Sequence, residues 1–289
     1  ADEIPENAVF NHVDWLDGEV YSYAASEMYD PITSMLPLFY YYPDVPVKSS
    51  NEAWELLKSS GLMELAEQEK AAVYILNPVN GTEYGEEDYD QWIRLSKAVS
   101  GSRNLDFEYT LDHGKASLKK LFVFGEGKGA DYVTDVLASD DVSSGLIAGT
   151  VLMGGSDAPE VSNYAVPAYL INSSEETVDY YKKINATDCE EETDGDIVYY
   201  NGSYVMDGGY TPKRVLVKLA EEEALTGDLV KDAWDQLLRR VWRDNLDQSN
   251  FTEGAENAVI LDRPDVEALD LTFNEITGEE TENTSQTRW

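Results

Sequence analysis

The stretch LFVFGEGKG, from Leu121 to Gly129, decides the fold of this chain. Its first four residues form a short apolar run that is typical of a buried strand. Three glycines follow at alternate positions, which is typical of a tight turn. Residues 130–137 then show a helical pattern. The stretch therefore predicts a strand, a glycine turn and a helix in direct succession.

The same unit of strand and helix recurs along the chain. Short apolar runs predict further strands at Leu36–Tyr42, Ala71–Leu76, Ile147–Met153, Val166–Ile171 and Arg214–Leu219. Amphipathic segments predict helices at residues 50–61, Asp88–Ser100, Val178–Ile184 and Leu229–Val241. Such alternation is the signature of a parallel sheet covered on both faces. We therefore expect an α/β fold with a mainly parallel open sheet and helices on both faces.

The glycine turn carries a resemblance to a known family. In α/β-hydrolases the nucleophilic serine lies on a sharp turn from strand to helix, with the pattern G-x-S-x-G. The matching frame here consists of Gly125, Glu126, Gly127, Lys128 and Gly129. With the order of elements across residues 36–241, it resembles the α/β-hydrolase superfamily, in particular its branch of secreted polyhydroxyalkanoate depolymerases and feruloyl esterase-like proteins. A dinucleotide-binding turn is disfavoured, because the third glycine of that fingerprint is absent at its spacing.

The resemblance also implies places for the acid and for the oxyanion segment. The acidic triad member would be Glu175, in a loop after a predicted strand. The oxyanion segment would fall at Tyr41, Tyr42 and Pro43, with Asp44 at its end. Proline has no N–H group with which to stabilise an oxyanion. The resemblance therefore implies an impaired oxyanion segment.

The serine and the histidine of the triad are both missing from their places. Gly127 stands where the resemblance implies a serine. The triad histidine of this fold follows the nucleophile and the acid in the chain. The chain has two histidines, His12 and His113, and both precede the turn. We therefore expect a relic pocket at residues 125–129 and Glu175, with no catalytic residue in it.

Several other candidate sites are weaker. Ser156 follows a predicted strand, but no histidine is placed to activate it, so a polar turn is the preferred interpretation. His113 is interpreted as a turn residue. The acidic loop at residues 188–196 has oxygen side chains at alternating positions, a faint likeness to a calcium loop, but it lacks the opening Asp and the closing Glu. With 57 Asp and Glu residues, no single carboxylate pair stands out as a glycosidase-type site.

Composition limits the partners. The net charge of -36 repels nucleic-acid phosphates and anionic membranes, which excludes nucleic-acid binding. It is typical of a salt-tolerant or secreted surface, and a cation-binding surface is the alternative. No apolar run approaches the roughly 20 residues that cross a bilayer. A single cysteine, Cys189, allows no internal disulfide. We expect neither a metal nor a cofactor, and no membrane insertion.

The sequence also bears on export. The first residue is Ala1, which suggests a removed leader or tag and, with the charge, a secreted or cell-surface protein. Acceptor sequences for N-linked sugar begin at six asparagines, and these matter if the source glycosylates. They are Asn80, Asn172, Asn185, Asn201, Asn250 and Asn283.

We interpret residues 1–262 as one α/β-hydrolase-like domain and residues 263–289 as an acidic polar tail or linker. The tail ends on Trp289, which suggests the start of a following domain. The preferred hypothesis is a catalytically silent module of a secreted ester hydrolase, which serves a catalytic domain of the same polypeptide as a structural or substrate-holding partner. One alternative is an active ester hydrolase with a non-standard nucleophile or a carboxylate pair. Another is a stand-alone protein that binds a small ligand.

Overall fold

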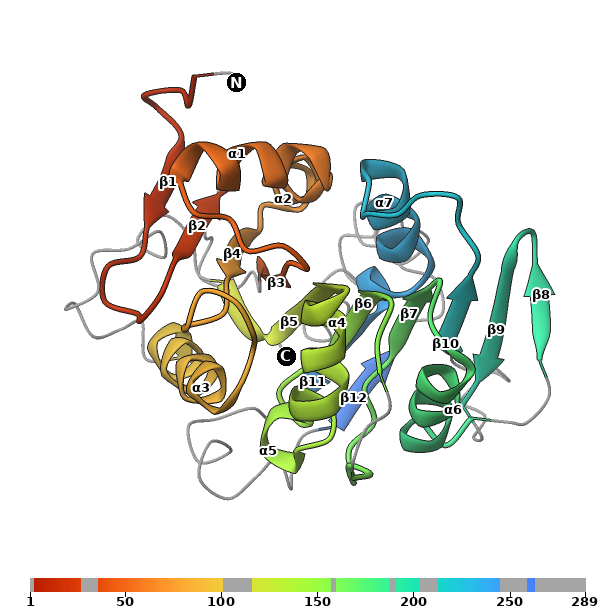
Figure 1. Ribbon diagram of the computed structural model, residues 1–289. Helices are drawn as coiled ribbons and strands as arrows, with labels where there is room; N and C mark the ends of the chain where they lie inside the picture. Colours follow the sequence, from red (N-terminus) through yellow and green to blue (C-terminus); the bar gives the residue numbers. More distant parts are fainter. Residues whose placement is uncertain are drawn as a thin grey trace, which may run out of the picture.

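The computed structural model describes residues 3–26, 36–100, 116–156, 160–187, 191–202, 213–244 and 259–262 (Figure 1). The strands are β1 (Val9–His12), β2 (Val20–Ala24), β3 (Leu36–Tyr42), β4 (Ala72–Leu76), β5 (Ala116–Glu126), β6 (Gly149–Met153), β7 (Ala168–Ile171), β8 (Glu192–Asp194), β9 (Ile197–Asn201), β10 (Lys213–Lys218), β11 (Val241–Asp244) and β12 (Val259–Asp262). The helices are α1 (Ser50–Ser59), α2 (Leu62–Glu69), α3 (Glu86–Ser100), α4 (Lys128–Tyr132), α5 (Asp141–Ser144), α6 (Glu175–Ile184) and α7 (Gly227–Gln236). A π-helical turn, Val133–Leu137, continues α4, and a 3-10 turn, Leu238–Arg240, follows α7.

Ten of the strands form one sheet, in the order β1-β2-β4-β3-β5-β6-β7-β10-β9-β8. The central strands, from β4 across to β10, pair in parallel. The strands at both edges pair antiparallel. β11 and β12 form a separate antiparallel pair. The predicted mainly parallel open sheet is confirmed.

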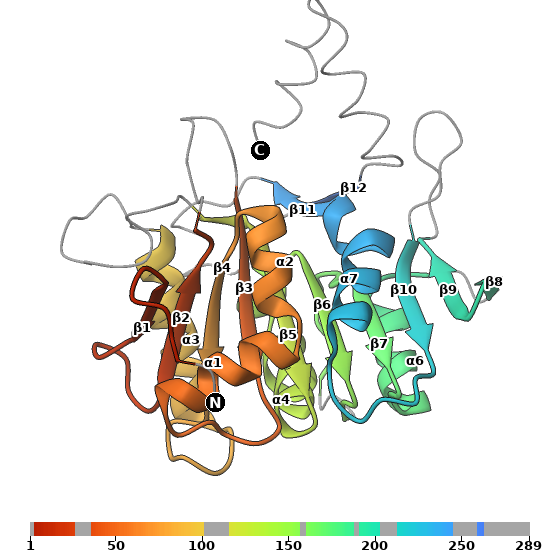
Figure 2. The same ribbon diagram turned by 90° about the horizontal axis from the view of Figure 1, so that it is seen from above.

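The sheet separates two hydrophobic layers. Side chains that alternate along β3 enter opposite layers, with Tyr40 in one and Phe39 and Tyr41 in the other. Helices α3, α4 and α6 cover the first layer, and α1, α2 and α7 cover the second (Figures 1 and 2). All seven residues of β3 are buried. This double burial explains why the central strands are continuous apolar runs in the sequence.

The parallel strands bring several loops to one edge of the sheet. The carboxyl ends of β4, β3, β5, β6, β7 and β10 lie at this edge, because these strands share one direction. In open α/β sheets, ligand sites form outside the carboxyl ends of the strands. The segments that follow these six strands therefore make up the candidate site.

Three expectations about the second half of the chain are wrong. The helix expected over Leu229–Val241 ends at Gln236, and Val241 is the first residue of strand β11. Residues 192–194, expected as part of an acidic loop, form the edge strand β8, which pairs with β9. Its three side chains are polar and exposed, so the sequence of this strand lacks the apolar pattern from which a strand is predicted. The helix expected from Val178 begins at Glu175, because the side chain of Ser174 accepts a hydrogen bond from the Thr177 N–H group and caps it.

A buried arginine joins β11 to the main sheet. Arg243 is 1% exposed, and its guanidinium donates to the carbonyl oxygens of Ile147 (2.8 Å), Ser144 (2.6 Å) and Ala165.

Residues 263–289, assigned to an acidic tail, lie outside the described residues, as do His113 and Cys189. Within the described ranges, no helix is both long enough and apolar enough to cross a membrane.

Candidate functional site

The glycine turn joins β5 to α4 through a single residue. Gly127 follows the last residue of β5 and has φ 46° and ψ -116°, a left-handed backbone that favours glycine. Its N–H group donates to the carbonyl oxygen of Met153 on β6 (3.0 Å), and its own carbonyl oxygen accepts from the Asp131 N–H group (2.9 Å). The turn is therefore sharp and held from both sides.

The two flanking glycines are required by packing. A Cβ atom on Gly129 would lie 1.9 Å from the carbonyl oxygen of Tyr42 on β3. A Cβ atom on Gly125 would lie 2.9 Å from Cα of Ala130. Both distances are far shorter than a non-bonded contact. Small residues are needed in this frame because the helix, the turn and the neighbouring strand approach so closely.

A carboxylate fills the place where a nucleophile would stand. A Cβ atom built on Gly127 would lie 2.1 Å from Oδ1 of Asp44, the second residue after β3. The same Oδ1 accepts a hydrogen bond from the backbone N–H group of Lys128 (2.9 Å). In the α/β-hydrolases, the N–H group after the nucleophile helps to stabilise the oxyanion. Asp44 therefore fills the nucleophile's position and engages this oxyanion donor as well.

The buried carboxylate of Glu126 joins three loops of the site. Glu126 is 8% exposed and accepts hydrogen bonds from the Tyr41 hydroxyl and from the Leu225 N–H group. Burial, together with the adjacent Glu126 carboxylate, raises the pKa of Tyr41 well above its ordinary value. The Tyr41 phenol therefore stays protonated and donates. Glu126 holds the turn, β3 and the segment before α7 together.

The segments after β3 and β4 lie against the glycine turn. Pro43 is buried, and its carbonyl oxygen accepts from the Tyr84 hydroxyl (3.0 Å). The Lys128 ammonium pairs with the Glu83 carboxylate at 2.6 Å. Tyr42 is fully buried beneath this site, in ring contact with Tyr84. The predicted oxyanion segment thus lies beside the turn, but Asp44 is the member that reaches it.

An asparagine side chain joins the end of β7 to the loop after β10. Asn172 directly follows β7 and has a φ of 50°. Its side-chain amide donates to the carbonyl oxygens of Ala220 (3.1 Å) and Glu222 (3.2 Å), and its oxygen accepts from the Ala220 N–H group (2.9 Å). Glu175, which the resemblance puts in the acid's place, is the first residue of α6 and is exposed. None of the hydrogen bonds among the described residues joins Glu175 to the loop after β10.

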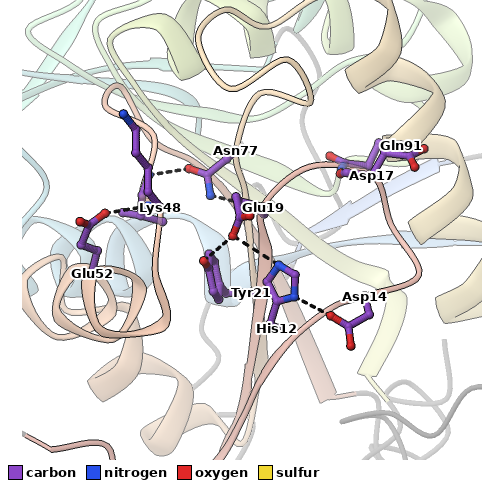
Figure 3. A network of polar contacts seen from close by, with 10 residues as sticks. His12, Asp14, Asp17, Glu19, Tyr21, Lys48, Glu52, Asn77 and Gln91 are labelled. Carbon is purple, nitrogen blue, oxygen red and sulfur yellow. Dashed lines mark hydrogen bonds and ion pairs between the residues drawn. The ribbon is translucent and has the colours of Figure 1, made fainter.

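No histidine reaches the site from the loop after β10. Residues 219–226 read LAEEEALT, and a histidine occurs nowhere after the turn. His12 lies on β1 at the edge of the sheet, where it contacts Asp14 (2.6 Å) and Glu19 (3.3 Å) (Figure 3). The same Glu19 carboxylate accepts from the Tyr21 hydroxyl at 2.6 Å. This network is four strands away from β5, so His12 has no access to the glycine turn.

The weaker candidates acquire structural partners. The Ser156 hydroxyl donates to the Asp135 carboxylate (2.6 Å), so it is engaged by an acid with no imidazole beside it. Asp131 lies near Asp135 and Asp44, and burial together with these two carboxylates raises its pKa. Within the part of the chain that the structure describes, no group of three or more His, Cys, Asp or Glu side chains is arranged to hold a metal ion.

Comparison with known proteins identifies the fold. No family model matches the sequence, and a search of the curated proteins finds no match. The chain is similar to an acetyl xylan esterase from Aspergillus awamori, at 12% identity and a TM-score of 0.50, over 78% of this chain and 97% of that one. The fold is that of the α/β-hydrolases. A feruloyl esterase module from Clostridium thermocellum is also similar, at 13% identity and a TM-score of 0.46, over 82% of this chain and 89% of that one.

The sequence did not reveal two of the residues that shape the site. Asp44 was visible only as the end of the expected oxyanion segment, and its fit against Gly127 depends on how β3 and β5 pair. Asn172 did carry a signal, because an asparagine directly after a strand often adopts a left-handed backbone and bonds to nearby main chain.

Proposed function

We propose that this α/β-hydrolase-fold domain is catalytically silent and serves a secreted ester hydrolase as a structural or substrate-holding module. One observation carries the proposal. The Asp44 carboxylate occupies the nucleophile's place at Gly127 and already accepts the Lys128 N–H bond. An ester oxygen that develops negative charge at that N–H group would meet a carboxylate instead of a free donor.

Three further features support the loss of covalent catalysis. The serine hydroxyl is replaced by a hydrogen atom at Gly127, the loop after β10 has no imidazole, and Asn172 cannot carry the charge of the triad acid. An acyl-enzyme needs both the nucleophile and its base. Without them, the domain could accelerate ester hydrolysis by at most about 10³- to 10⁴-fold over the reaction in water, and only where an oxyanion hole survives. Here the oxyanion donor is engaged by Asp44.

The secreted setting and the catalytic partner are part of the same proposal. The net charge of -36 favours a solvated, salt-tolerant surface of the kind that exported proteins carry. A silent fold is most easily retained where an active neighbour supplies the chemistry. Reading the encoding gene beyond residue 289 tests this. An esterase domain with an intact G-x-S-x-G and a following histidine supports it, and a stop codon directly after Trp289 contradicts it.

Restoring the serine tests the silence itself. We expect Gly127→Ser to hydrolyse short-chain aryl esters no faster than the unchanged chain, because no base takes the hydroxyl proton. Gly85→Ser is the matched control, since a Cβ atom there has open space around it and lies outside the turn. Turnover by Gly127→Ser but not by Gly85→Ser would reveal a base in the site and overturn the proposal.

One observation favours a second candidate function. Since Asp44 places a carboxylate oxygen at the nucleophile's position, an ester hydrolase with an aspartate nucleophile is the alternative. In that case the unchanged chain hydrolyses esters, and Asp44→Asn abolishes the activity. If neither the unchanged chain nor Asp44→Asn hydrolyses esters, the result supports the catalytically silent module.

A further inference from the structure

The sequence is rich in acceptor sites for N-linked sugar. Six of its asparagines begin an Asn-x-Ser/Thr sequence. Serine and threonine make up about one residue in eight, so chance pairing would give roughly two such sequences. The structure describes four of the six, and these four differ sharply in what their side-chain amides do.

Asn80 has a side-chain nitrogen that is free to react. It is exposed in the loop after β4, and its Oδ1 accepts from the Thr82 N–H group (2.8 Å), the Thr82 hydroxyl (3.1 Å) and the Glu83 N–H group (2.9 Å). Among the described residues, no hydrogen bond uses Nδ2 of Asn80. Gly81 lies between Asn80 and Thr82, and a Cβ atom built on it has no neighbouring atom within 4 Å, so the space around this loop is open.

The other described acceptors use Nδ2 to hold the fold. Asn185 is 5% exposed, and its Nδ2 donates to the carbonyl oxygens of Val166 (2.7 Å) and Tyr181 (2.8 Å). Nδ2 of Asn201 donates to Glu192 at 2.7 Å, and Nδ2 of Asn172 donates into the loop after β10. A glycan on Asn185 would need space that the core does not have.

We propose that Asn80 is an N-glycosylation site and that Asn185, despite its matching sequence, is not. The donor is an isoprenoid diphosphate-linked oligosaccharide, used by the oligosaccharyltransferase of the producing cell. Nδ2 of Asn80 forms a bond to the anomeric carbon. The bond from that carbon to the diphosphate oxygen breaks, the diphosphate keeps the electron pair, and Nδ2 gives up one proton. The step involves no oxidation.

The position of Asn80 would bring the glycan to the edge of the candidate site. Asn80 lies four residues beyond the carboxyl end of β4, and Glu83 in the same loop pairs with Lys128 beside the glycine turn. The inference rests on the export in the proposed function and not on the catalytic silence, so ester assays and glycan mapping can fail independently.

Secretion of the chain from a cell that glycosylates tests the site. Residues 1–289 would be secreted behind a signal peptide from a mammalian cell line, together with a reporter glycoprotein that proves the machinery active. Peptide-N-glycosidase F in ¹⁸O-water then marks each formerly occupied asparagine, and peptide mass spectrometry reads the sites. We expect the label at Asn80 in most molecules and none at Asn185.

Point variants separate the modification from accidental effects. Thr82→Ala should abolish the label at Asn80, because the hydroxyl of the acceptor sequence is gone, whereas Thr82→Ser should keep it. Asn80→Gln should remove one glycan from the intact mass and leave the far-UV circular dichroism unchanged. A secreted, folded chain with Asn80 unlabelled beside a glycosylated reporter overturns the proposal, as does a label at Asn185 in that chain.

Discussion

The glycine turn and the loops around it differ in what they have kept of the α/β-hydrolase design. The turn keeps the whole backbone geometry, with Gly125 and Gly129 packed too tightly to accept a side chain and Gly127 in a left-handed conformation. The loops after β3, β7 and β10 lie at the same edge of the sheet and differ in their residues from the catalytic pattern that the resemblance implies. An aspartate, an amide and a histidine-free loop stand there.

This difference shows that two kinds of constraint act at one site. The turn is fixed by packing, because a Cβ atom in it would collide with β3 or α4, and packing holds whether or not the domain catalyses anything. The loops are fixed by chemistry only as long as a reaction depends on them. Around this turn, Asp44, Glu126 and Asn172 supply structural hydrogen bonds.

The largest expected effect is at the turn. Gly129→Ala should destabilise the domain by about 3 kcal/mol or more, because its Cβ atom would lie 1.9 Å from a backbone oxygen that cannot move freely. Gly85→Ala is the matched control and should change the free energy of unfolding by less than about 0.5 kcal/mol. Urea denaturation measures both. Equal stability of the two variants would show that packing does not fix the turn.

An intermediate effect is expected where the turn meets the loops. Glu126→Gln keeps the shape but turns one acceptor oxygen into a donor, and it then faces either the Tyr41 hydroxyl or the Leu225 N–H group. The free energy of unfolding should fall by about 1 to 3 kcal/mol, which is the cost of a buried polar group without a hydrogen-bond partner. Glu83→Gln, at the exposed pair with Lys128, is the control and should cost at most about 1 kcal/mol. A neutral Glu126→Gln would mean that this carboxylate does not hold the loops.

How far the sequence predicts this molecule follows from the same two constraints. The central strands and the glycine turn were predicted, because double burial and close packing leave apolar runs and glycines in the sequence. The edge strands β8 and β1 were missed, since at the edges backbone pairing can proceed with little apolar pattern. β2 was missed although all five of its residues are buried. Asp44 gained its role from a contact between distant loops, which no local pattern encodes. Asn172 carried the local signal of an asparagine after a strand, but its bonds to the loop after β10 join residues 48 positions apart.

The smallest effect concerns charge at the crevice. Burial, with Asp135 and Asp44 nearby, raises the pKa of Asp131, so the folded state holds this proton more tightly than the unfolded chain. Ionised Asp131 therefore costs stability, and the cost grows as the pH rises from about 3.9 through the raised pKa. Asp131→Asn should stabilise the domain at pH 7 by a few tenths of a kcal/mol, discounted for solvent screening. The gain should vanish near pH 4 in thermal melts. Destabilisation at pH 7 would contradict this account.

The most direct test of the central claim is ester turnover by the unchanged chain. The purified protein and Asp44→Asn would be incubated side by side with short-chain aryl esters, with and without a serine-directed phosphonate, against an equally handled blank. The account predicts product release equal to the blank in every sample, since the turn offers neither a hydroxyl nor a free oxyanion donor. Turnover that rises with protein concentration, and that either the phosphonate or the loss of the Asp44 carboxylate abolishes, would contradict it.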